Sequence, residues 1–92
     1  MKVQWSAPAE DDVDRIHRHI HETNPAAADS VLQLIVKGCH DLANFPHRGR
    51  TSRMGGGRRE LVFQSLPYIA VYRVKKEAVE ISRVYHSAQD WP

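Results

Sequence analysis

The chain has 92 residues, of which 41% are hydrophobic and 26% are charged. That length suits a single domain over residues 1–92, because domains typically run to about 100–150 residues and so short a chain cannot build two cores. The composition is too apolar for a disordered chain. No apolar run approaches the ~20 residues of a membrane span, and the first residues carry no signal-peptide pattern. The one cysteine, Cys39, cannot form an internal disulfide, so we expect a reduced, cytoplasmic protein.

The net charge of +2 conceals an uneven distribution. Residues 1–45 hold four basic and seven acidic residues, a net charge of −3. Residues 46–92 hold nine basic and four acidic residues, a net charge of +5. Five arginines and no acidic residue lie from His47 to Arg59. An acidic half and a basic half indicate two surfaces with different partners.

The first part of the chain predicts a short strand followed by a helix. Residues 3–6 are β-prone, and after them apolar residues recur at helical spacing from Val13 to Ile20. Ser6 is placed to cap this helix. The proline after Asn24 ends it, because the residue before a proline avoids the helical region.

The same Asn24-Pro25 pair starts a second, longer helix, which we expect to run from Pro25 to Phe45. Its apolar residues repeat at intervals of three or four, and they are Val31, Leu32, Ile35, Cys39, Leu42 and Phe45. Two long helices joined by so short a turn form an antiparallel hairpin.

Beyond Pro46 the pattern changes from helix to strand. Residues 47–57 predict a loop rich in glycine and arginine. Three runs then alternate with the period of a strand and are rich in β-branched and aromatic residues: 59–64, 68–74 and 79–86. Their connections have hairpin length, so we expect successive antiparallel strands. The predicted fold is α+β, with the order β-α-α-β-β-β and a helical hairpin packed on one face of a small, mainly antiparallel sheet.

The basic residues of the loop and the sheet predict a binding surface. Arginine binds phosphate and carboxylate through two parallel hydrogen bonds, so we interpret these residues as a contact for nucleic acid or for an acidic protein partner. The alternative is a solvated loop with no specific role. The candidates are Arg48, Arg50, Arg53, Arg58, Arg59, Arg73 and Arg83. The glycines at 55–57 are no nucleotide-binding P-loop, because no Lys-Ser/Thr follows them, and we expect no cofactor.

A second candidate site is catalytic and joins Arg59, Arg83 and His86. RNA can be cut without a metal ion when a base, an acid and a cation surround one phosphate. A histidine titrates in the range needed for base or acid, and the two arginines would stabilise the charged transition state. Tyr85 or Tyr68 could stack on a base or donate a proton. The alternative is that the arginines pair with carboxylates such as Glu60 or Glu80, and that His86 hydrogen-bonds the backbone at the strand end.

The remaining candidates predict no further chemistry. His17, His19 and His21 lie close together on the first predicted helix, but no Cys, Asp or Glu follows at a spacing typical of metal sites, so we expect no metal. Cys39 lies on the apolar side of the second helix and is expected to be a small buried hydrophobic residue.

Six segments cover nearly the whole chain in a fixed order: SAPAEDDVDRIHRHI, ETNPAAA, FPHRGR, RREL, LPYIAVYRV and VEISRVYHSAQDWP. In this order they resemble the RelE/ParE superfamily of type II toxin–antitoxin toxins, which includes plasmid-stabilisation toxins. The resemblance implies a growth-inhibiting bacterial toxin that an acidic, partly disordered antitoxin neutralises in a hetero-oligomer. The antitoxin would lie along the helical hairpin and the sheet, and no membrane partner is implied.

The resemblance leaves two targets open. ParE-like members poison DNA gyrase, and the long helical hairpin with its Asn-Pro-Ala-Ala-Ala turn favours this branch. RelE-like members are mRNA endonucleases that act on the ribosome without a metal. Arg59 and Arg83 match the sheet arginines of the family, and His86 matches its C-terminal histidine. The chain lacks the loop lysine and terminal tyrosine of some RNA-cleaving members. A third possibility is a small interaction module without toxicity.

Overall fold

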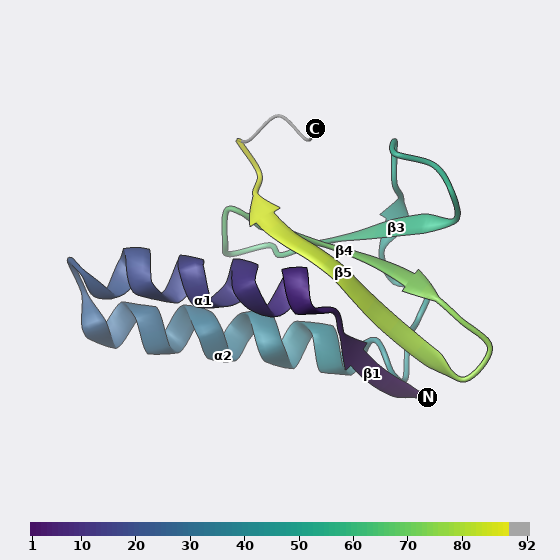
Figure 1. Cartoon of the computed structure of the whole chain (residues 1–92), viewed down its shortest axis with the longest axis horizontal. Coiled ribbons are helices and arrows are strands. Elements are labelled where there is room, and N and C mark those ends of the chain that lie inside the picture. The colour runs from purple at the N-terminus through teal and green to yellow at the C-terminus, as the bar shows by residue number, and fades with distance from the viewer. Residues whose placement is uncertain (89–92) are drawn as a thin grey trace.

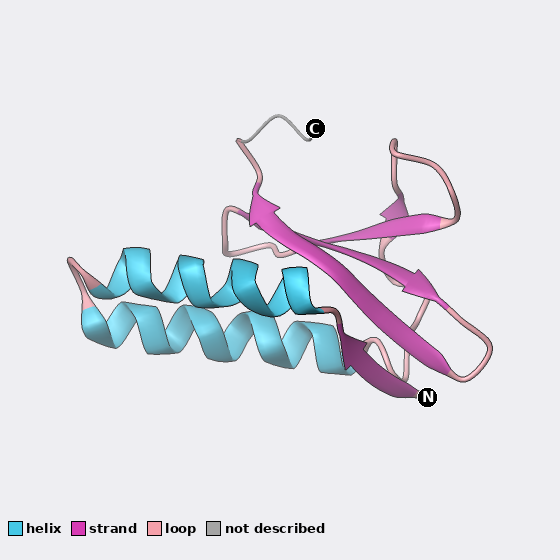
Figure 2. Cartoon of the chain, viewed as in Figure 1, coloured by secondary structure: helices cyan, strands magenta, loops and turns pink. Residues whose placement is uncertain are grey.

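Figure 1 shows the computed structural model of the protein, which describes residues 1–88. The last four residues of the motif VEISRVYHSAQDWP therefore lie outside the described residues. The elements in chain order are β1 (Lys2–Trp5), α1 (Ala7–His21), α2 (Pro25–Asp41), β2 (Arg50–Thr51), β3 (Arg58–Val62), β4 (Tyr68–Val74) and β5 (Ala78–His86). The helices form an antiparallel hairpin on one side of the sheet (Figure 2). The predicted α+β class is confirmed, with one strand more than expected.

The helices begin where their caps predict. Ser6 Oγ and Asn24 Oδ1 each accept a hydrogen bond of 3.1 Å from the backbone N–H three residues further on. α2 ends at Asp41, so the predicted end at Phe45 is wrong. The N–H groups of residues 42–44 bond to carbonyls three residues back, which tightens the chain into a turn. Leu42 is nevertheless fully buried, so the apolar repeat continues past the helix.

The sheet has five strands in the order β1-β5-β4-β3-β2. β1 pairs with β5 in parallel, and the other pairs are antiparallel. β2 is the strand that sequence patterns missed. It consists of Arg50 and Thr51, both exposed, so it has no apolar residue that could mark it as a strand.

A bulge in β5 shifts the pairing of this strand with β4. Tyr72 lies opposite Ile81 and Val71 opposite Arg83, so Ser82 is the extra residue. The start of α1 is attached at this point, because Ser6 donates its backbone N–H to the Ile81 carbonyl (3.0 Å) and its hydroxyl to the Ser82 carbonyl (2.9 Å). The bulge therefore lies at the junction of β1, α1 and β5.

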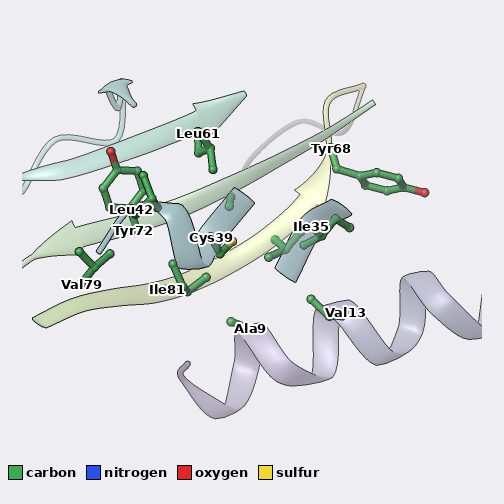
Figure 3. Packing of buried hydrophobic residues seen from close by; sticks show 12 residues of the cluster. Ala9, Val13, Ile35, Cys39, Leu42, Leu61, Tyr68, Tyr72, Val79 and Ile81 are labelled. Atoms are coloured by element: carbon green, nitrogen blue, oxygen red, sulfur yellow. The ribbon is translucent and has the colours of Figure 1, made fainter. Parts of the chain in front are cut away.

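The main core fills the space between the helical hairpin and the sheet. Figure 3 shows Ile35 and Cys39 of α2 facing Tyr72 and Ile81 of the sheet, and all four are fully buried. Burial of each large apolar side chain contributes about 1.5–3 kcal/mol. Among residues 1–88, no helix is long and apolar enough to cross a membrane.

Candidate functional site

The sheet has a helix side, which carries Tyr72 and Ile81, and a far face, which carries the separate buried cluster Ile69, Val71 and Tyr85. Cross-strand pairing assigns the candidate residues to these faces. Arg83 lies opposite Val71 on the far face. The bulge precedes Arg83, so strict alternation continues beyond it.

Arg83 is held by a carboxylate of α1. Its Nε and Nη2 donate to Asp12 Oδ2 (2.8 Å) and Oδ1 (2.9 Å). The backbone N–H of Val84 also donates to Asp12 Oδ2 (2.9 Å), where β1 has ended and leaves the edge of β5 uncovered. We expected Glu60 or Glu80 as the carboxylate partner of this arginine, and the partner is instead Asp12.

The environment of Asp12 favours its ionised form. Its side chain is 3% exposed, and burial alone would raise the pKa of the carboxyl. The hydrogen bonds from Arg83 and Val84 and the positive charge of Arg83 outweigh burial, and the pKa of Asp12 is lowered. The same ion pair raises the pKa of Arg83. The pair is therefore a structural salt bridge that connects α1, near the N-terminus, to β5, near the C-terminus.

His86 lies on the other side of the sheet from Arg83. It pairs with Tyr68 of β4, a residue of the helix-side core, and the two rings meet edge to face with centroids 5.5 Å apart. Its Nδ1 accepts a hydrogen bond from the backbone N–H of Ala88 (3.0 Å). The backbone contact at the strand end is therefore confirmed.

Arg59 holds the segment that follows α2. Its Nη1 donates to the Gly49 carbonyl (2.8 Å). Beside it, Tyr72 donates its hydroxyl to the Pro46 carbonyl (2.8 Å) and accepts the N–H of Gly49 (2.8 Å). Burial raises the pKa of Tyr72, so this hydroxyl remains a donor at neutral pH.

The three candidate catalytic residues do not converge on one point. Arg83 lies on the far face, and Arg59 and His86 lie opposite Tyr72 and Tyr68. These tyrosines are four residues apart along β4, a separation of about 13 Å at 3.3 Å per residue. The backbone register therefore places the three residues on both faces of the sheet and at different positions along β4.

Glu60 organises the far face and was missed as a functional residue. Its carboxylate is almost fully buried, with Oε1 accepting from Arg50 Nε (3.1 Å) and Nη2 (3.0 Å). Oε2 accepts from the Ser52 hydroxyl (2.9 Å). Burial and the charge of Glu60 raise the pKa of neighbouring Tyr85. One signal could have identified Glu60, since it is the only acidic residue between Asp41 and Glu77.

The other candidate residues have simpler surroundings. The guanidinium of Arg48 lies over the Phe45 ring, 4.8 Å from its centroid. His17 is 2.9 Å from Asp29, but no group of three potential metal ligands occurs among residues 1–88. Cys39 is fully buried, which confirms its predicted role, and burial raises the pKa of its thiol to about 12.

A groove of about 600 Å³ follows the outer edge of β3, lined by Gly38 of α2, residues 48–50 and residues 60–64. β2 covers this edge only at Arg59 and Glu60. A Cβ atom on Gly38 would lie 2.5 Å from the Phe63 ring, so this glycine lets the ring rest on the helix. The groove combines apolar walls, strand backbone and arginines, which suits an extended protein segment.

The chain thus combines a helical hairpin, a mixed sheet and a far face that carries several arginines. Residues 3–91 match the family model described as ParE toxin of type II toxin-antitoxin system, parDE, and the chain belongs to this family. Within the ParE/RelE superfamily it is thus a toxin of a type II toxin–antitoxin system.

Similar proteins carry names from both branches of the superfamily. The putative toxin Y4kP of Sinorhizobium fredii is 36% identical, over 99% of this chain and 93% of its own. Toxin RelE3 of Caulobacter vibrioides is 33% identical, over 95% of each chain. A solved structure of the chromosomal ParDE system from P. aeruginosa has a TM-score of 0.83 at 29% identity, covering 94% of this chain and 95% of that one. The RelBE2 toxin–antitoxin complex of Mycobacterium tuberculosis has a TM-score of 0.65 at 26% identity, covering 92% of this chain and 95% of that one.

Proposed function

We propose that the chain is a ParE-like toxin that poisons DNA gyrase in the bacterial cytoplasm and does not cleave RNA. The observation that supports this most is that Asp12 of α1 engages the guanidinium of Arg83, while His86 pairs with Tyr68 on the helix side of the sheet. RNA cleavage without a metal requires base, acid and cation within hydrogen-bond reach of one phosphate. The separation of these residues favours the branch that has no such catalytic set.

We further propose that a cognate antitoxin binds the groove along β3. The solved relatives include a ParDE system and a RelBE2 toxin–antitoxin complex. Val62, which lines the groove, is 46% exposed, and a bound segment would cover it. The arginines that line the groove, Arg48 and Arg50, suit an acidic antitoxin and a hetero-oligomeric toxin–antitoxin assembly.

An mRNA endonuclease of the RelE type is the second candidate. Two relatives of 33% and 32% identity are the toxins RelE3 and RelE2 of Caulobacter vibrioides, which supports this alternative. In this case Arg59, Arg83 and His86 would act on RNA, with Tyr85 as a possible proton donor. The Asp12–Arg83 pair would then have to open when the ribosome binds.

Expression of the chain without its antitoxin separates the two candidates. Gyrase poisoning predicts growth arrest with induction of the DNA-damage response, intact mRNA and linear plasmid DNA trapped by purified gyrase. In that case His86→Ala remains toxic, because this ring packs on Tyr68 and needs no chemistry. Rapid mRNA loss with cuts at codon positions, abolished by His86→Ala, would instead establish the endonuclease.

Growth without arrest, with soluble protein in the cell, would contradict both toxin mechanisms and favour the interaction module. The antitoxin surface is tested in the same cells. Val62→Lys places a charge at the exposed edge of β3, so we expect unchanged toxicity and loss of rescue by the antitoxin.

A further inference from the structure

Two arginines stand directly opposite each other on the far face. Arg58 of β3 is the cross-strand neighbour of Arg73 of β4. Side chains at such positions start about 5 Å apart, and like charges there destabilise the sheet. Both residues are half-buried, so water screens their repulsion only in part.

The nearby acidic residues form their ion pairs with other basic residues. Glu60 binds Arg50, and Glu80, which lies opposite Arg73, binds Lys75 at 3.0 Å. Among residues 1–88, no Asp or Glu forms an ion pair with Arg58 or Arg73. The Nε of Arg73 is also buried without a hydrogen-bond partner. Buried donors are normally satisfied, so the guanidinium of Arg73 has a donor that no acceptor of residues 1–88 uses.

A glycine turn lies against both guanidinium groups. Gly55, Gly56 and Gly57 all have positive φ, of 70°, 66° and 74°. A Cβ atom on Gly56 would lie 3.0 Å from Arg58 Nη1 and 3.8 Å from Arg73 Nη2. The glycine therefore keeps the space above the two guanidinium groups free of a side chain.

We propose that Arg58, Arg73 and the turn at 55–57 form a binding site for a phosphate group of a nucleic-acid backbone. The two non-bridging oxygens of a phosphodiester can each accept from one guanidinium, so a single phosphate relieves the repulsion between them. Carboxylates inside this protein bind differently, since Asp12 and Glu60 each accept the fork of one arginine. The proposal goes beyond the gyrase target and does not depend on it.

Backbone recognition predicts binding without sequence preference and with strong salt dependence. The test uses fluorescein-labelled duplex DNA of about 20 base pairs and single-stranded RNA of equal length, with anisotropy measured over a range of salt concentrations. Polyglutamate serves as a competitor that offers carboxylates in place of phosphates. The test variant is Arg58→Gln/Arg73→Gln, and the matched control Arg18→Gln/Lys37→Gln removes the same charge from exposed positions of the helices.

We expect the wild-type chain to bind at least one of the two nucleic acids. The Arg58→Gln/Arg73→Gln variant should lose about tenfold or more in affinity, and the slope of log K against log salt should fall by about 1 for each arginine. The control should stay within about twofold of wild type, because its residues make no backbone contact in this proposal. Removal of the repulsion should also leave the melting temperature equal or higher, which separates lost binding from lost folding.

Three results would overturn the proposal. The first is that neither nucleic acid binds, or that both double variants lose affinity equally. The second is that polyglutamate displaces the probe as well as unlabelled DNA does, which would make this a carboxylate site. The third concerns Arg58→Lys/Arg73→Lys, which keeps the charge without the planar fork and should retain the salt slope while losing affinity. If this lysine variant matches wild type in affinity, the guanidinium geometry has no role.

Discussion

The Asp12–Arg83 ion pair joins residues 71 positions apart, so its removal should lower the stability of the whole fold. We expect Asp12→Asn to lower the free energy of unfolding at pH 7 by about 2 kcal/mol, because it weakens charge-assisted hydrogen bonds from Arg83 and Val84. The value is below that of a fully buried pair because the Arg83 side chain is 41% exposed. Chemical denaturation of the two proteins measures the difference.

The stabilising effect of the Asp12 carboxylate depends on pH. The pKa of Asp12 is lower in the folded chain than in the unfolded chain, so its ionisation stabilises the fold at neutral pH. That contribution is lost as the pH falls below about 4, through the titration range of the carboxyl. The gap between wild type and Asp12→Asn should therefore shrink on acidification. Asp14→Asn, on an exposed position of the same helix, serves as the control and should change little; a gap that stays constant with pH would contradict the prediction.

Residue-level properties were predictable where they depend on local pattern. Cys39 could be placed in the core because its neighbours at helical spacing are apolar. The partner of Arg83 could not be predicted, because no local pattern connects a residue of β5 to Asp12 in the second turn of α1. Strict alternation along the last strand does predict that Arg83 and His86 lie on opposite faces, and this is confirmed because the bulge precedes Arg83. The bulge itself could not be predicted, and it puts Arg83 on the opposite face from Ile81.

At the scale of elements, the segment between α2 and β2 is fixed by contacts that leave no space at Gly49. A Cβ atom there would lie 2.6 Å from both the Glu60 carbonyl and the Tyr72 hydroxyl. We expect Gly49→Ala to cost about 2 kcal/mol or more, because backbone or a buried, hydrogen-bonded hydroxyl must move. Gly55→Ala has open space but a φ of 70°, so we expect about 1 kcal/mol. Thermal denaturation should rank the two variants in this order, and the reverse order would show that this contact is easily relaxed.

Helices and strands with a strong local sequence pattern were predicted well, whereas the pairing of β1 and β2 with other strands was not. β4 spans the predicted residues 68–74, because five of its seven residues are buried and four of these five are β-branched or aromatic. β2 consists of two exposed residues, and its partner strand alone makes it part of the sheet. The parallel pairing of β1 with β5 joins the two ends of the chain, which no short-range pattern can reveal.

At the scale of the whole molecule, the uneven charge is divided between two layers. The acidic half forms the helical hairpin with β1, and the basic half forms the rest of the sheet with its loops. Two buried acidic residues, Asp12 and Glu60, form ion pairs with Arg83 and Arg50, respectively. The sequence alone does not show which arginines are paired in this way. Composition could predict a basic surface, whereas only the fold shows which arginines remain available to a ligand.

The buried thiol of Cys39 can be used to measure how often the core opens. Cys39 is fully buried between the helices and the sheet, and burial raises the pKa of its thiol to about 12. We expect a thiol reagent to reach it only when the core opens as a whole, so the labelling rate should rise exponentially with urea. The control is Ser30→Cys in a Cys39→Ala background, which places the thiol on an exposed position of the same helix and should react at the rate of a free cysteine. Labelling of Cys39 that does not depend on urea would indicate local opening of α2.

The same thiol can report on the antitoxin without contact to it. A partner that binds only the folded chain lowers the population of the open state by the factor 1 + [L]/Kd. At a hundredfold excess over Kd, labelling of Cys39 should therefore slow by about a hundredfold, while the thiol at position 30 should be unaffected if it lies outside the interface. Unchanged labelling at saturating antitoxin would mean that the partner does not stabilise this fold, and that the toxin is neutralised without coupling to the stability of its core.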